Sequence, residues 1–194
     1  MHNVAAVRPR NPVDRRRPDG YGPAVQNVGG YRYVGPDQMA DRAAAPDAIG
    51  VSVPAQLAAW LAGREHDEVR EPFTFVVTLD GGLRLAPRRS EHVTLADHGR
   101  VLAAGEIRFD RVDDRWQVVE VTNQSTGYCP DPDSWPAVGA ALDRLGVSHP
   151  GDFTEKITFR RCPACSERNI VRDNDFTCAL CDSALPTRWN FVAD

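Results

Sequence analysis

The sequence predicts an α+β protein with a mainly antiparallel, meandering sheet, two short helices and a small C-terminal zinc ribbon. Alternating apolar and polar residues mark several short strands that are joined by tight turns. Two other stretches repeat apolar residues at the spacing of a helix. Near the C-terminus, two Cys-x-x-Cys pairs have the spacing of a four-cysteine zinc site.

Composition narrows the class of protein. The chain has 194 residues, of which 42% are hydrophobic and 26% charged, as in one soluble domain with a small appendage. No apolar run approaches the roughly 18 residues that span a bilayer, so we expect no membrane segment. The first residues lack the apolar stretch of a secretory signal. We therefore expect a cytoplasmic protein, whose cysteines bind metal more often than they form disulfides.

The net charge of −4 conceals a basic N-terminus, because residues 1–20 contain five arginines and two acids. Residues 1–28 combine arginine with proline and offer little apolar surface to bury, so they are predicted to form a disordered basic arm. Such an arm either contacts a phosphate backbone or an acidic partner, or is simply solvated.

Residues 29–158 are predicted to form the α+β core. It begins with a short strand at 31–34, bounded by glycines. A helix is expected to start after Ser52, which is a residue type that caps helices. Its apolar face would consist of Leu57, Trp60 and Leu61.

Two hairpins follow. Residues 73–85 alternate around Asp-Gly-Gly, which accepts the positive φ angles of a tight turn. Residues 101–109 and 115–122 form a second pair of strands around a polar turn. A second helix, with apolar residues at helical spacing, is expected at 135–145, and a last strand at 157–161 leads into the ribbon.

Residues 159–194 are predicted to form a zinc ribbon with a C-terminal clamp. Each Cys-x-x-Cys pair makes a knuckle whose two sulfurs face one ion, and the segment between the pairs suits a hairpin. Four thiolates complete a closed tetrahedron at about 2.3 Å, which predicts structural and not catalytic zinc. Redox-active thiols or an iron centre are the alternatives. The predicted ligands are Cys162, Cys165, Cys178 and Cys181.

Charge also bears on what the ribbon binds. Residues 160–194 carry five arginines and five acids, so the ribbon is not a basic patch, which argues against strong duplex binding. Trp189 and Phe191 are expected to fasten the ribbon to the core, with an exposed recognition patch as the alternative.

A resemblance appears in the middle of the chain. The runs HVTLADHGRVLAAGEI at 92–107 and VTNQSTGYCP at 121–130 contain a histidine, an Ala-Ala-Gly strand and a Ser-x-x-Tyr-x-Pro turn. In order and spacing they resemble the core of the plant IQ-motif calmodulin-binding family and related terminal domains of bacterial effector-like proteins. Gly127 stands where the family has a second histidine, and the chain has no IQ helix, so calmodulin binding does not carry over. The matching residues are His92, Thr94, Gly99, Ala103, Ala104, Gly105, Ser125, Tyr128 and Pro130.

The resemblance implies a small α/β core in which His92, Ser125 and Tyr128 approach one another. The residues themselves offer a candidate ligand-binding cluster, because a histidine titrates near neutral pH and loops at strand ends often carry function. The alternative is that these side chains brace the loop. Cys129 is the one cysteine outside the predicted zinc site, either a packing residue or a thiolate nucleophile. The candidate cluster comprises His92, Glu106, Asn123, Ser125 and Tyr128.

Three functions remain open from the sequence. The first is a zinc-binding, non-catalytic adaptor or regulatory protein that binds another protein, favoured because the sequence shows no phosphate loop, dinucleotide fingerprint or nucleophile elbow. The second is an enzyme or effector that uses the cluster around His92, Glu106, Ser125 and Tyr128. The third is a nucleic-acid-associated protein that uses the arginine arm and the ribbon.

Overall fold

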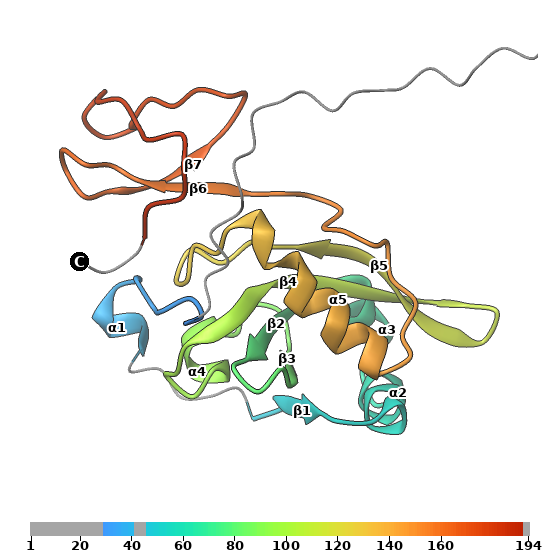
Figure 1. Ribbon diagram of the computed structural model, residues 1–194. Coiled ribbons are helices and arrows are strands. Elements are labelled where there is room, and N and C mark those ends of the chain that lie inside the picture. Colours follow the sequence, from blue (N-terminus) through green and yellow to red (C-terminus); the bar gives the residue numbers. More distant parts are fainter. Residues whose placement is uncertain (1–28, 41–45, 192–194) are drawn as a thin grey trace, which may run out of the picture.

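The computed structural model describes residues 29–40 and 46–191, which form a sheet covered on both faces and a hairpin that projects beyond it (Figure 1). The five-stranded sheet has the order β1-β3-β2-β4-β5, and every neighbouring pair is antiparallel. A separate pair, β6 and β7, forms the projecting hairpin. The α+β class with an antiparallel sheet is thus confirmed. The sheet strands are β1 (Ile49–Val51), β2 (Phe73–Thr78), β3 (Leu83–Ala86), β4 (Val101–Val112) and β5 (Arg115–Thr122).

The two helices expected from apolar spacing are present, and the described residues also contain three shorter ones. They are α2 (Pro54–Ala62) and α5 (Trp135–Arg144). The short helices are α1 (Asp37–Ala40), α3 (His66–Arg70) and α4 (His92–Leu95), and a 3₁₀ turn, η1 (Pro132–Ser134), precedes α5.

The period-2 alternation of β2 divides the core between the two faces of the sheet. Phe75 and Val77 pack with α2 and α5, in a cluster that includes Leu57 and Leu142. Val76, between them in sequence, belongs to the cluster on the opposite face, together with α4 and Tyr128. Because side chains alternate along a strand, a continuous run of buried residues requires cover on both sides. The residues that cover the second face include Tyr31, Val93 and Leu95.

β4 pairs with β2 and not with β3, so the chain crosses to the far edge of β2 between residues 87 and 100. Gly105 lies where β4 and β5 meet, and a Cβ atom there would collide with the Thr122 carbonyl. The glycine of the Ala-Ala-Gly run therefore permits a close approach of the two backbones.

Two local predictions were wrong. Of the expected strand at 31–34, only Tyr31 bridges the sheet, to Val101, because Val34 turns to donate its N–H to Gly127. Ser52 does not cap α2 with its side chain. Instead the Gln56 side chain accepts the backbone N–H groups of Ser52 and Val53 at 2.9 and 3.3 Å. The predicted disordered arm, residues 1–28, lies outside the described residues.

Candidate metal centre

The hairpin that follows the core gathers the four predicted ligands. β6 (Thr158–Arg161) leads directly into Cys162, and β7 (Arg168–Val171) follows the first knuckle. Each knuckle repeats one backbone pattern. The first cysteine donates its N–H to the carbonyl five residues on, and its own carbonyl accepts from the residue four positions on. The pattern occurs at Cys162 and again at Cys178, so the two knuckles present their sulfurs in the same way.

The four Sγ atoms lie within 4.8 Å of one another and form a cluster that could bind one metal ion. Two of the separations, Cys162 to Cys181 and Cys165 to Cys178, are 3.6 Å. Four sulfurs at the usual zinc–sulfur distance in a tetrahedron would be about 3.8 Å apart. The donor set and its spacing therefore fit a thiolate-binding ion without rearrangement of the backbone.

Both knuckles end in a left-handed residue. Ser166 has φ of 63° and Asp182 has φ of 57°, at equivalent positions one residue past the second cysteine of each pair. A residue with a side chain costs roughly 1 kcal/mol or more in this region relative to glycine. This cost arises in both turns that direct the four sulfurs toward one point. A metal ion bound by the sulfurs would offset it.

A second layer of polar groups holds the ligands. The buried Asn169 amide donates from Nδ2 to the Glu167 carbonyl at 3.0 Å and to the Cys178 sulfur at 3.6 Å, and its Oδ1 accepts from Ala179 at 2.9 Å. Asn169 thus links the two knuckles. Hydrogen bonding to Ser183 lowers the pKa of Cys181 and favours its thiolate. Such partners orient metal ligands and neutralise part of their charge.

The ribbon is fastened to the core by its C-terminal segment. Trp189 packs edge-on against Tyr31, with ring centroids 5.3 Å apart, and Phe191 lies in a small apolar cluster with Cys129 and Phe159. On the other side of the hairpin, the buried Arg160 side chain donates to carbonyls of the same C-terminal segment. Trp189 and Phe191 are therefore packed at the junction.

His92, the first of the candidate cluster, is engaged with the sheet. It begins α4, and its Nε2 lies 3.0 Å from the carbonyl oxygen of Gly105. Burial lowers the pKa of His92 to about 4, a shift that the Gly105 carbonyl opposes only in part. The ring is therefore neutral at physiological pH and shares its Nε2 proton with the backbone.

Ser125 and Tyr128 also bind backbone. The Tyr128 hydroxyl donates to the Gly99 carbonyl at 2.7 Å, and the backbone N–H of Tyr128 donates to Ser125 Oγ at 3.4 Å. Burial raises the pKa of Tyr128, so its phenol stays protonated. Both side chains lie in the core with exposed fractions of 1% or less.

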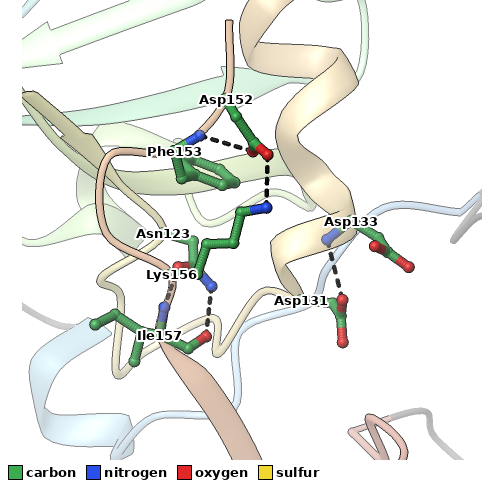
Figure 2. Close-up of polar contacts among 7 residues, drawn as sticks. All are labelled: Asn123, Asp131, Asp133, Asp152, Phe153, Lys156 and Ile157. Carbon is green, nitrogen blue, oxygen red and sulfur yellow. Dashed lines mark hydrogen bonds and ion pairs between the residues drawn. The ribbon is translucent and has the colours of Figure 1, made fainter. Parts of the chain in front are cut away.

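Asn123 connects three segments, and Figure 2 shows its two hydrogen bonds with Ile157. Its Nδ2 donates to the carbonyls of Pro130 and Ile157, each at 2.8 Å, and its Oδ1 accepts the Ile157 N–H at 2.7 Å. Every polar hydrogen and the oxygen of this fully buried amide are used. The amide therefore ties the start of the loop after β5 to the segment that enters the ribbon.

Burial also shifts the pKa values of Glu106 and Cys129. Partial burial raises the pKa of Glu106, and Arg88 is the cation that opposes this shift. Burial raises the pKa of Cys129 to about 12, so the thiol is not activated as a nucleophile.

A cavity of about 240 Å³ borders part of this cluster. His92 lines it together with Thr126 and Gly127, whereas the other four candidate residues do not. Arg168 from the ribbon also lines it. Sequence reasoning missed Arg168 and Asn169, because nothing in the spacing of an arginine or an asparagine indicates which segment its side chain will meet.

Comparison with known proteins identifies no relative, since no family model, curated protein or solved structure matches the chain. The resemblance to the IQ-motif family therefore has no support beyond the residues quoted for it. Among the described helices, none combines the length and apolar character needed to cross a membrane.

Proposed function

We propose that this protein is a zinc-binding, non-catalytic adaptor that binds another protein through its ribbon. The convergence of four cysteine sulfurs within 4.8 Å carries the proposal. Zinc bound by all four would have no open position for water, so it would stabilise the hairpin and not activate a substrate. In reducing surroundings, such as the expected cytoplasm, the thiols would remain available to the ion.

The form of the ribbon supports a binding role. It projects from the sheet (Figure 1), and Leu180 in the second knuckle has 67% of its surface exposed. An exposed leucine beside a metal-stapled turn gives a partner protein a rigid apolar contact. Equal numbers of arginines and acids in residues 160–194 favour a protein partner over a nucleic acid.

The experiment is affinity capture with the intact chain, followed by measurement of binding to the recovered partner with purified components. Leu180→Glu should abolish that binding, whereas Leu79→Glu, at another exposed leucine on the core, should leave it unchanged. Removal of zinc should have the same effect as Leu180→Glu. Equal binding by the metal-free protein would rule out the ribbon as the contact surface.

The cavity beside His92 favours a second function, that of an enzyme or effector acting on a small molecule. The neutral His92 ring, with Nε2 engaged by Gly105, argues for a supporting role over acid–base chemistry. Turnover that is lost in His92→Gln, with thermal stability retained, would favour this second function.

A further inference from the structure

Two arginines face each other across the ribbon hairpin. Arg161 of β6 and Arg168 of β7 are paired residues in the antiparallel ladder, and the pair Phe159 and Ile170 lies two positions along. Residues two apart on a strand share a face, so the arginines continue the face that packs Phe159 against the core. Like charges directly opposite each other destabilise a sheet. A bound anion would remove that cost.

Contacts around the arginines place them at the junction of core and ribbon. Arg168 donates from Nη1 to the Thr126 carbonyl at 2.5 Å. Both guanidinium groups oppose the effect of burial on the pKa of Cys129, so both lie near that thiol. The Nε of Arg161 is buried and has no hydrogen-bond partner among the described residues. An ion or a water would satisfy a buried donor of this kind.

Of this pair, Arg168 forms part of the wall of the cavity of about 240 Å³. Thr126 and Gly127 form another part of the wall. Within residues 29–40 and 46–191, the backbone N–H groups of Thr126 and Gly127 have no acceptor. The ring of Tyr33 lies against Gly127, where a Cβ atom would approach it to 2.7 Å. Met39 and Tyr33 supply apolar surface to the same wall.

The other charges around the cavity restrict the ligand. His92 lines the cavity in its neutral form, and Glu91 contributes a carboxylate. Glu91 raises the pKa of Tyr33, whereas Arg168 lowers it, so both charges act at the same phenol. Glu91 would repel a multiply charged anion such as phosphate more strongly than a singly charged one. A single carboxylate suits the guanidinium group of arginine, which can bind it through two hydrogen bonds.

We propose that the cavity, with Arg168 in its wall and Arg161 paired with Arg168 across the hairpin, binds a small organic monocarboxylate whose apolar part packs on Tyr33. This site is independent of the proposed adaptor role, since it requires neither a partner protein nor the exposed Leu180. The cavity joins core and ribbon, so a bound carboxylate would also stabilise the junction.

The test uses benzoate and hexanoate as aromatic and aliphatic probes, with benzamide as the neutral control, on the full zinc-loaded chain. Amide resonances of Gly127 and Arg168 should shift and saturate with either carboxylate and stay unchanged with benzamide. Arg168→Gln should weaken binding by about tenfold, the effect of removing one charged hydrogen-bonding partner, and Arg161→Gln should weaken it less, because Arg161 would act only through its charge. Arg172→Gln, at an exposed position just past β7, is the matched control and should bind as the parent does.

Zinc content and the melting temperature of each variant identify any that fail to fold, and Arg168→Lys then replaces Arg168→Gln as the milder change. The proposal is overturned if neither carboxylate binds at about 10 mM, the weak end of specific recognition. It is also overturned if Arg172→Gln weakens binding as much as Arg168→Gln, or if inorganic phosphate binds as well as benzoate.

Discussion

Trp189 donates its indole N–H to the carbonyl oxygen of Cys129 at 2.7 Å, across 60 residues of sequence. The bond connects the C-terminal segment of the ribbon to the loop that carries Ser125 and Tyr128. The same loop meets the ribbon a second time, where Arg168 donates to Thr126. The hairpin with the four-cysteine cluster and the turn at residues 125–130 therefore share one structural junction.

Trp189→Phe should destabilise this junction. The substitution keeps an aromatic ring but leaves the Cys129 carbonyl without its donor, at a cost of about 1 kcal/mol in the free energy of unfolding. Thermal unfolding should show a melting temperature lower by about 3 °C for a chain of this size. Trp135→Phe is the control, since its indole N–H has no acceptor among the described residues. A larger loss in the control would contradict the role of the hydrogen bond.

Cys178→Ser should release the metal and unfold the ribbon, whereas Cys129→Ser should retain both. The first removes one of four ligands, and zinc binding contributes about 10 kcal/mol or more in small zinc-dependent domains. The second changes a buried thiol whose sulfur donates to Thr126, a contact that a hydroxyl can also make. Metal analysis and thermal unfolding of the two variants measure the difference. Equal losses would show that the ribbon does not depend on the ion.

Asn169→Asp should weaken metal retention with little effect on the core. The carboxylate removes the two N–H donors and places a negative charge beside the Cys178 thiolate, while it still accepts from Ala179. Release of zinc to a chelator should become faster by about tenfold, and the thiolate-to-cobalt absorption of the cobalt-substituted protein should shift. Asn174→Asp introduces the same charge in the exposed turn of the hairpin and should change neither quantity.

Stability should fall as the pH is lowered from about 6.5 to about 4. The pKa of His92 is about 4 in the folded protein and close to 6.5 in the unfolded chain. Between pH 6.5 and 4, therefore, the imidazole of His92 is protonated in the unfolded chain but not in the folded protein. The contribution is fully present above pH 6.5 and is lost as the pH falls toward 4. It should amount to about 1 to 3 kcal/mol.

The pH dependence of chemical unfolding for His92→Gln tests this assignment. The variant should show a flatter profile than the parent between pH 4 and 6.5, and His66→Gln, at an exposed position, should keep the parent profile. If the His92→Gln profile is as steep as that of the parent, other groups cause the acid sensitivity.

Local patterns predicted most of the elements. The Asp-Gly-Gly turn and the alternation around it predicted the β2–β3 hairpin, and apolar spacing predicted α2 and α5, because these signals depend on near neighbours. The sequence did not indicate that β4 pairs with β2, since that choice depends on where α4 packs. For the same reason, the helical position of His92 was not foreseen.

The candidate metal site was likewise only partly predictable from the sequence. The Cys-x-x-Cys spacing predicted a cluster that the structure forms, because each knuckle is a local turn. The second layer was not predictable, since Asn169 and Ser183 are ordinary polar residues until the hairpin folds. Asn123 was expected as a member of a candidate site, and its contacts with Pro130 and Ile157 also give it a bracing role.

The most direct test of the account is metal analysis, with X-ray absorption at the zinc edge, of protein purified without added zinc. The account predicts about one zinc per chain, coordinated by four sulfurs at about 2.3 Å. Less than about a tenth of an equivalent of zinc, with no iron in its place, would contradict it, because structural sites of this kind retain their ion.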